Sequence, residues 1–233
     1  INKLKNFYFV ADVSNRHDLS SLENFLSDHQ LMIDALINCA GVYGPIGNTL
    51  DIDLEEFQKA FNINFFGTLN MIKASKNFFK KAIKKKVINF SGGGAASPFP
   101  YYSAYATSKA AIVRLTENLS IELKNDSFDI NCIAPGFVIT RLHQETIKAG
   151  PEKMGKEFYE NTKKMIENGG VSHSYSCDLV SFLLSGHSDG ITGKFISANW
   201  DKWNDKEYLK EIRQNNNFAT LRRIDKKFFF HRD

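Results

Sequence analysis

Two side chains in the segment YATSK, Tyr105 and Lys109, have the types and the spacing needed for proton transfer. Four residues apart on a helix, the phenol and the ammonium lie on one face, close enough to interact. A neighbouring cation favours the phenolate, so we expect it to lower the tyrosine pKa from about 10 toward neutrality. Such a phenol exchanges a proton with an alcohol or carbonyl oxygen. Alone the pair is weak evidence, because Tyr/Lys pairs at this spacing are common on solvated helices.

The segment SGGGAASPFPYY precedes this pair and begins with Ser91, which ends an apolar strand and has a hydroxyl to offer to a carbonyl. Its glycines are not expected to hold phosphate, because Pro98 and Pro100 follow where a helix N-terminus would be required. They predict a flexible loop that carries Ser91. Tyr101 and Tyr102 are expected to line the substrate pocket.

The elements that position these residues alternate between short apolar runs and longer amphipathic stretches. Strands are predicted at 7–12, 34–41, 87–92, 128–136 and 193–198, and helices at 19–26, 54–79, 104–123 and 177–184. Strands that are apolar throughout and separated by helices indicate a parallel sheet covered on both faces. The fold class is therefore α/β, a doubly wound, Rossmann-like parallel sheet. Ligands bind such sheets at the carboxyl ends of the strands.

Three more segments fall at or beside those strand ends. NCAG (38–41) ends a strand in small residues that let a flat ligand approach the backbone, and PGFVIT (135–140) follows the next but one. Asn64 lies in the middle of an amphipathic helix, beside its apolar stripe. A buried amide there is costly unless it is hydrogen-bonded, so Asn64 is either a structural hydrogen-bonding residue or a link in a proton relay.

As an ordered set, these segments resemble the short-chain dehydrogenase/reductase family in its single-domain branch. The matching residues are DV (Asp12 and Val13), NCAG (38–41), Asn64 in NINFFGT, INFS (88–91), YATSK (105–109) and PGFVIT (135–140), and GITGKFISA (190–198) is similar to the family's last strand. The resemblance implies an oxidoreductase that uses NAD or NADP to interconvert an alcohol and a carbonyl by hydride transfer.

The resemblance also implies a role for each matching residue. Tyr105 would be the general acid/base, Lys109 would lower its pKa and bind the nicotinamide ribose, Ser91 would polarise the substrate oxygen, and Asn64 would hold the relay water. The implied cofactor-binding residues are Asp12 and Val13 at the adenine, Asn38, Ala40 and Gly41 along the cofactor, Tyr105 and Lys109, and Pro135, Gly136, Val138 and Thr140 at the nicotinamide.

The chain departs from the family pattern at three places. Cys39 stands where a second asparagine is usual, and SANWDKW replaces the usual close of the last strand. The stretch from Ser91 to Tyr105 is one residue longer than the commonest arrangement, so strict spacing from the tyrosine puts Gly92 at the serine position. We assign the role to Ser91, because a glycine-rich loop absorbs one residue easily and Gly92 has no hydroxyl.

The family's glycine-rich phosphate turn has no counterpart before Phe7. A βαβ unit takes about 30 or more residues, so we expect an N-terminal βαβ portion to be missing and the given chain to be inactive without it. The choice between NAD and NADP depends on that portion. Residues 1–233 are otherwise interpreted as one dinucleotide-binding and catalytic domain. Within it, 141–170 is either a substrate lid or an inconsequential surface excursion, and 199–233 is a C-terminal extension.

The amino-acid composition limits the classes of binding partner that we expect. A net charge of +4 with scattered lysines gives little support to nucleic-acid binding, and the stretch KKAIKKK (80–86) is interpreted as a solvated helix end. Three cysteines without C-x-x-C spacing favour neither disulfides nor zinc and suggest a reducing, cytoplasmic location. No apolar run is long enough to span a membrane, and no metal is expected. The predicted partners are a small alcohol or carbonyl substrate and further copies of the chain, as a homodimer or homotetramer.

Two other functions remain open at this point. A dinucleotide-binding sensor without catalysis uses the same fold, although such sensors tend to lose the tyrosine or lysine. A sugar-nucleotide epimerase or dehydratase also has Tyr-x-x-x-Lys, but NCAG, PGFVIT and the short C-terminal region argue against it.

Overall fold

The computed structural model describes residues 6–81 and 84–223. Its centre is a four-stranded sheet in the order β1-β2-β3-β4, in which every neighbouring pair is parallel. The strands are β1 (Ala35–Asn38), β2 (Lys85–Phe90), β3 (Phe128–Ala134) and β4 (Phe195–Ser197). β3 is buried at every position, which explains its uninterrupted apolar sequence. The predicted Rossmann-like parallel sheet is confirmed, and each observed strand lies within or next to its predicted range.

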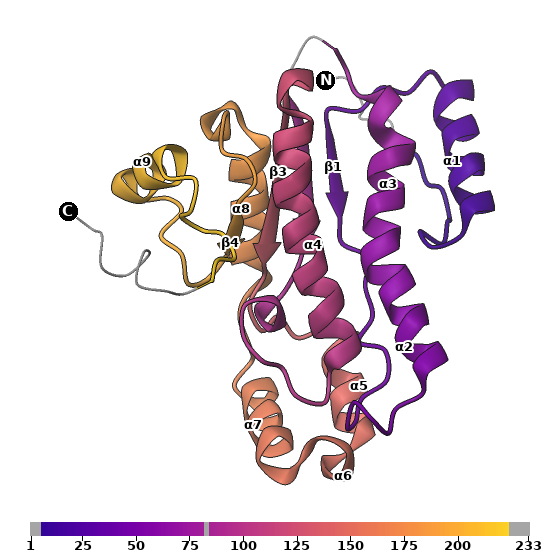
Figure 1. Cartoon of the computed structure of the whole chain (residues 1–233), viewed down its shortest axis with the longest axis vertical. Helices are drawn as coiled ribbons and strands as arrows, with labels where there is room; N and C mark the ends of the chain where they lie inside the picture. Colours follow the sequence, from indigo (N-terminus) through magenta and orange to yellow (C-terminus); the bar gives the residue numbers. More distant parts are fainter. Residues whose placement is uncertain (1–5, 82–83, 224–233) are drawn as a thin grey trace.

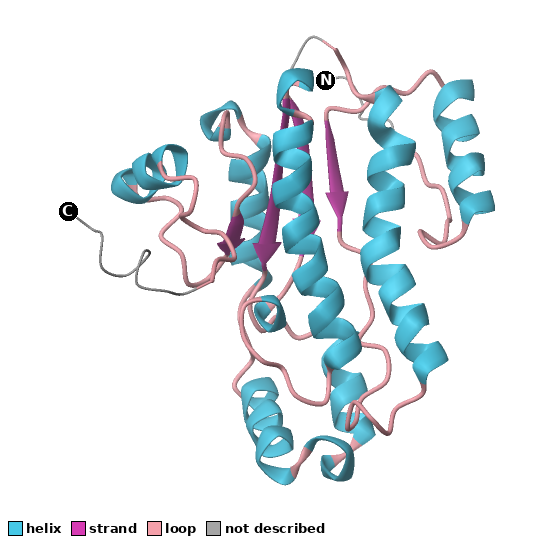
Figure 2. Ribbon diagram, viewed as in Figure 1, coloured by secondary structure: helices cyan, strands magenta, loops and turns pink. Residues whose placement is uncertain are grey.

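Helices cover both faces of the sheet (Figures 1 and 2). Alternate residues of each strand point to opposite faces. Val87, Ile130 and Cys132 pack toward α3 (Gly67–Ser75) and α4 (Ser103–Glu122), while Ile88, Ile133 and Ile196 form one cluster with α8 (His173–Leu184). α1 (Arg16–Asp28) lies outside α3, and α9 (Lys206–Gln214) adds Ile212 to the α8 cluster.

The predicted helix 54–79 is continuous but changes its geometry partway. α2 (Leu54–Phe61) is followed by a π-helical segment at Asn62–Phe66, by α3 and by a short 3-10 turn at Lys76–Phe78. The Asp53 side chain caps α2 by accepting from the Glu56 backbone N–H at 3.0 Å. The π-helical segment contains Asn64, whose side chain is fully buried. Such segments are frequent at functional sites.

The predicted strand at 7–12 is wrong. These residues have no regular secondary structure. In the described part of the chain the sheet ends at β1, and none of its strands shares hydrogen bonds with residues 7–12. Their aromatic side chains pack on α1 instead: the ring centroid of Phe9 lies 5.2 Å from that of Phe25, and that of Phe7 lies 6.2 Å away. An extended apolar sequence forms a strand only where a partner is available, and the N-terminal βαβ portion stays a prediction.

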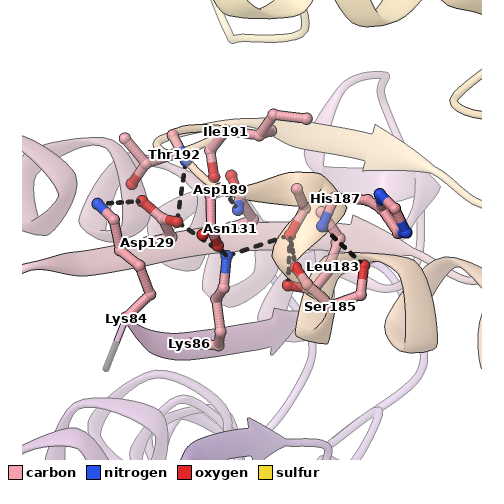
Figure 3. A network of polar contacts seen from close by, with 12 residues as sticks. Lys84, Lys86, Asp129, Asn131, Leu183, Ser185, His187, Asp189, Ile191 and Thr192 are labelled. Carbon is pink, nitrogen blue, oxygen red and sulfur yellow. Dashed lines mark hydrogen bonds and ion pairs between the residues drawn. The ribbon is translucent and has the colours of Figure 1, made fainter. Parts of the chain in front are cut away.

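The interpretation of residues 80–86 as a solvated helix end is wrong for Lys86. It lies in β2, is 5% exposed, and its Nζ donates to Asp129 Oδ2 at 2.9 Å and to Asp189 Oδ1 at 2.7 Å. Figure 3 shows this network at the amino ends of β2 and β3, where Ser188 also accepts from Lys86 at 3.2 Å. The network ties the start of the sheet to the loop that follows α8, at the end opposite the strand carboxyl termini.

Residues 141–170 form three helices below the carboxyl ends of the strands (Figure 1). They are α5 (Arg141–Ala149), α6 (Pro151–Met154) and α7 (Lys156–Glu167), and α7 packs against both others. The C-terminal segment also returns to the fold: Phe218 and Ala219 pack on the α8 cluster, and Lys194 Nζ donates to the backbone carbonyls of Asn215 at 2.8 Å and Phe218 at 3.0 Å. Residues 224–233, in the C-terminal extension, lie outside the described residues.

Candidate active site

A large cavity of about 890 Å³ opens at the carboxyl ends of β1, β2 and β3. Such an edge is where the crossovers of an open parallel sheet leave room for a ligand. Gly41 from the loop after β1, the residues 90–94 after β2, and Tyr105 and Lys109 from the first turns of α4 line it together. The fourth wall is the segment after β3 and the start of α5. Its members are Pro135, Gly136, Phe137, Val138, Thr140, Arg141, Leu142 and His143.

Tyr105 and Lys109, on the α4 side of the cavity, are both largely removed from bulk water. Lys109 is 4% exposed, and its Nζ donates to the backbone carbonyl of Phe90 at 2.8 Å. The same nitrogen lies 5.7 Å from the centroid of the Tyr105 ring. An ammonium has three N–H donors, so this bond to the end of β2 anchors Lys109 and leaves donors for a ligand.

The pKa values of the pair differ from the expectation. Burial raises the pKa of Tyr105 to about 12 and lowers the pKa of Lys109. Both shifts have the same cause, since removing a group from water disfavours its charged form. The prediction that the lysine lowers the tyrosine pKa toward neutrality is therefore wrong for the protein without a bound ligand, where burial outweighs the cation.

Asn64 holds the loop that forms the floor of the cavity. Its Oδ1 accepts from the Val42 N–H at 2.8 Å, and its Nδ2 donates to the Val42 carbonyl at 2.9 Å and to Ser108 Oγ at 2.9 Å. The buried amide is thus satisfied, as its position in an apolar stripe requires. The Asn64 carbonyl accepts from the Thr68 hydroxyl at 2.7 Å. These contacts account for a structural role of Asn64.

The floor of the cavity at Gly41 has room for a flat ligand because it has no side chain. A Cβ at Gly41 would lie 3.2 Å from Asn64 Oδ1 and 3.3 Å from Lys109 Nζ. The bare backbone therefore faces the lysine directly. Together with the small residues after β1 and the bend at Gly136, which has φ +82°, this surface fits a nicotinamide and its ribose.

A second hollow of about 90 Å³ adjoins the floor of the large cavity. Val13, Asn38, Cys39 and Ala40 line it, and Cys39 also lines the large cavity. Asn38 Nδ2 donates to Asn89 Oδ1 at 2.9 Å, so this amide links β1 to β2. Asp12 lines neither hollow: its Oδ1 accepts from the Ser14 hydroxyl at 2.7 Å and from the Ser14 N–H at 2.8 Å, and these two bonds lower the pKa of the Asp12 carboxyl.

Ser91 lines the large cavity, but its hydroxyl has a partner within the protein. Its side chain is 3% exposed, and its hydroxyl donates to the backbone carbonyl of Lys109 at 3.0 Å. The residue that faces the Tyr105 hydroxyl is Gly92, where a Cβ would lie 2.6 Å from Tyr105 Oη. Strict spacing from the tyrosine had pointed to Gly92. The assignment of the polarising role to Ser91 stays a prediction.

The two tyrosines expected to line the substrate pocket do not line the cavity. Tyr102 is 1% exposed, and its hydroxyl donates to Thr146 Oγ1 on α5 at 2.9 Å, so it belongs to the core between α4 and the 141–170 helices. Tyr101 lies outside the cavity lining. Sequence reasoning missed Tyr43, which lines the cavity and packs edge-on against Tyr105 with ring centroids 5.0 Å apart. Its place two residues after NCAG was the available signal.

Other cavity residues come from segments far apart in the chain. The His143 ring packs at a tilt against Phe137 with ring centroids 4.0 Å apart, and burial lowers the pKa of His143. His173 begins α8, and Trp200, from the segment that departs from the family pattern, stands at the rim and is 83% exposed. No sequence spacing links these three positions, so only the fold brings them together.

A comparison with protein families identifies the family of the chain. The family model described as enoyl-(acyl carrier protein) reductase matches residues 1–199. The chain belongs to the short-chain dehydrogenase/reductase family. Members of this family are NAD(P)-dependent oxidoreductases that act on alcohols and carbonyls, so this short-chain dehydrogenase/reductase is an enzyme of that class.

Named relatives and solved structures agree with this assignment. A diacetyl reductase of Staphylococcus epidermidis, described as (S)-acetoin forming, is 31% identical over 81% of this chain and 75% of its own length. An L-2,3-butanediol dehydrogenase of Corynebacterium glutamicum is 29% identical over 82% of this chain and 76% of its own. The crystal structure of the short-chain dehydrogenase/reductase YIR035C from Saccharomyces cerevisiae superimposes with a TM-score of 0.73 at 26% identity, covering 88% of this chain and 79% of that one.

Among residues 6–81 and 84–223, no helix combines the length and the apolar character needed to cross a membrane. The His, Cys, Asp and Glu side chains of the same residues form no group of three or more suited to a metal ion.

Proposed function

We propose that this short-chain dehydrogenase/reductase reduces a small ketone, or oxidises the matching alcohol, with Tyr105 as the general acid/base. The observation that carries the proposal is the convergence of Tyr105 and Lys109 with the bare floor at Gly41 on one cavity. When bound, the nicotinamide supplies or accepts the hydride. Tyr105 gives its phenolic proton to the substrate oxygen during reduction and takes it back during oxidation.

The remaining residues hold the reactants in place. Lys109, anchored on Phe90, faces the bare floor where the nicotinamide ribose would lie, and Gly41 and the segment 135–140 border the nicotinamide itself. Val13, Asn38 and Ala40 would continue the cofactor site toward the adenine, with Asp12 beside them. Asn64 keeps the loop after β1 in position through Val42. The resemblance to the family would also give Asn64 a relay water to hold.

The substrate class that we propose is a vicinal diketone or hydroxyketone. Two named relatives, a diacetyl reductase and a butanediol dehydrogenase, act on compounds with oxygens on adjacent carbons. The cavity walls of Tyr43, Phe99 and Phe137 provide apolar contacts for the alkyl ends of such a compound. The helices of 141–170 would act as a lid, because α5 supplies Arg141, Leu142 and His143 to the cavity.

The test is a carbonyl panel with the full-length protein. Oxidation of NADH or NADPH is followed at 340 nm with diacetyl, acetoin and simple monoketones, each cofactor being tried separately. We expect turnover with at least one vicinal carbonyl compound and a clear preference for one of the two cofactors. Tight dinucleotide binding without turnover of any carbonyl or alcohol would contradict the proposal and favour the sensor.

We further propose a cytoplasmic homo-oligomer. All three cysteines are free thiols, as in reducing compartments. The helices α2–α3 and α4 expose apolar side chains at Leu54 (67%), Phe66 (45%) and Ile121 (75%), which an interface between copies that pairs these helices would bury. Light scattering after size exclusion should give a dimer or tetramer for the full-length protein, and Phe66→Glu should shift it toward monomer. A monomeric wild type at micromolar concentration would contradict this.

A further inference from the structure

Position 92 has no room for a side chain, because the Tyr105 hydroxyl lies where its Cβ would be. A Cβ placed on Gly92 would lie 2.6 Å from Tyr105 Oη and 3.4 Å from Cζ. Carbon and oxygen atoms that are not bonded do not approach so closely, so the phenol would have to move. The backbone at Gly92 is extended, with φ −174° and ψ 171°, a conformation that any residue adopts. The requirement for glycine comes from Tyr105 and not from the chain path.

The neighbouring hydroxyl is turned the other way. Successive residues of an extended chain point to opposite sides, and Ser91 directs its hydroxyl to the backbone carbonyl of Lys109 at 3.0 Å. The thiol of Cys132 on β3 also contacts this serine. Ser91 is therefore part of the packing between β2, β3 and α4, while the side of the loop that faces Tyr105 is glycine backbone.

We propose that Gly92 is a positioning residue for Tyr105: by lacking a side chain it seats the phenol oxygen against the loop, so that Tyr105 meets the substrate oxygen without a hydroxyl from residue 92. This inference rests on the proposed function of Tyr105 as the general acid/base. It assigns a role to Gly92 that differs from that of a hydrogen-bonding side chain at the same place.

Gly93 provides a matched comparison within the same loop. A Cβ at Gly93 would meet no atom within 4 Å, and its φ lies outside the left-handed region. Alanine therefore adds the same methyl group at both positions without backbone strain. At Gly92 it meets the phenol, and at Gly93 it enters open space beside it. Gly186→Ala, whose Cβ also meets nothing within 4 Å, is a control far from the cavity.

The first experiment titrates Tyr105 in the full-length protein without substrate or cofactor, using tyrosine labelled with ¹³C at Cζ and assigned with Tyr105→Phe. Burial against the loop holds the pKa of Tyr105 at about 12. In Gly92→Ala the displaced hydroxyl moves toward the cavity, so we expect its pKa to fall, while Gly93→Ala and Gly186→Ala leave it unchanged. An unchanged titration of Tyr105 in Gly92→Ala would overturn the proposal.

The second experiment is a double-mutant cycle on thermal unfolding. Gly92→Ala should lower the melting temperature when Tyr105 is present, and the loss should shrink by at least half in the Tyr105→Phe background, because the atom in conflict has been removed. Equal losses in both backgrounds would overturn the proposal. This cycle and the titration need no turnover, so they decide the role of Gly92 even if the proposed activity is absent.

The third experiment measures carbonyl reduction by Gly92→Ala and Gly92→Ser. We expect kcat to fall at least tenfold in both, with the KM for the dinucleotide unchanged, because a shift of about 1 Å in a reacting group is costly. A serine that raises kcat would show that the position accepts a hydroxyl beside Tyr105, and the proposal would be wrong. If wild-type protein reduces no carbonyl at all, the proposed function fails and the first two experiments still stand.

Discussion

Lys109 and Tyr105 share one wall of the cavity, but the lysine is anchored to the sheet and not to the phenol oxygen. Its Nζ donates to the Phe90 carbonyl at 2.8 Å and lies 5.7 Å from the centroid of the Tyr105 ring. The end of β2 thus fixes the height of the ammonium above the cavity floor at Gly41. Because burial and not this cation dominates at Tyr105, the pair consists of a neutral phenol and a lysine whose pKa is lowered.

Tyr105→Phe tests the proton transfer directly. The change removes one oxygen and leaves the ring packed against Tyr43, so the fold and the affinity for dinucleotide should be retained. We expect kcat for carbonyl reduction to fall by about 10² to 10⁴, the usual contribution of a positioned acid/base. Tyr175→Phe, at a tyrosine that is 51% exposed, is the matched control and should behave as wild type. Unchanged turnover in Tyr105→Phe would exclude the tyrosine mechanism.

The high pKa of Tyr105 predicts different pH profiles for the two reaction directions. Reduction uses the protonated phenol, which is present throughout about pH 6 to 9 because burial raises its pKa to about 12. Its rate should therefore stay level in that range. Oxidation uses the phenolate, whose small fraction grows about tenfold per pH unit, so its rate should rise steadily. The pH dependence of kcat/KM for the dinucleotide in both directions checks this, because kcat/KM reports the pKa values of the free enzyme. A fall in reduction near neutral pH would contradict it.

The sequence predicted the sheet and the placement of Tyr105 and Lys109 on one cavity because both depend on local patterns. Apolar runs that end in small residues marked β1, β2 and β3, and the spacing of Tyr105 and Lys109 placed them on one face of α4. The strand at 7–12 failed because a strand depends on its neighbour as well as on its own residues. Phe7 and Phe9 found Phe25 of α1 instead.

The details of the site were beyond sequence reasoning for a geometric reason. Whether Ser91 or Gly92 faces Tyr105 depends on which side of the loop each residue presents, and one residue reverses the answer. In the same way, the sequence places Lys86 in a basic stretch that is expected at the surface. Only the pairing of β2 with β3 brings Asp129 beside it. Neither the residue that faces Tyr105 nor the partner of Lys86 can be deduced from composition alone.

Asn64 should be needed for the loop after β1 whether or not it takes part in catalysis. Asn64→Ala leaves the N–H and the carbonyl of Val42 without their partner, and burial of such groups costs about 1–3 kcal/mol. We expect a loss of that size in the free energy of unfolding, measured by urea denaturation. Asn70→Ala, which removes one longer bond of 3.2 Å to the Val13 carbonyl, should cost less. Equal losses at the two asparagines would contradict this account of Asn64.

The buried ion network at the amino ends of β2 and β3 should stabilise the fold far more than an exposed pair of the same type. Lys86→Met leaves Asp129, whose side chain is 2% exposed, without its main cation, and breaking a buried pair in this way costs about 3–5 kcal/mol. Lys80→Met is the matched control. It removes an ion pair with Asp34 in which the side chains are 49% and 57% exposed, and such pairs contribute about 0–1 kcal/mol.

Salt separates the two lysines further. Exposed charges are screened by added salt and buried ones much less, so 1 M NaCl should reduce the small effect of Lys80→Met and leave most of the effect of Lys86→Met. Both variants are compared with wild type by urea denaturation at low and high salt. Because the network lies at the opposite end of the sheet from Tyr105, Lys86→Met that remains folded should keep the wild-type KM for carbonyl substrate. A loss of stability no larger than that of Lys80→Met would show that Asp129 finds other partners, such as Lys84, when Lys86 is removed.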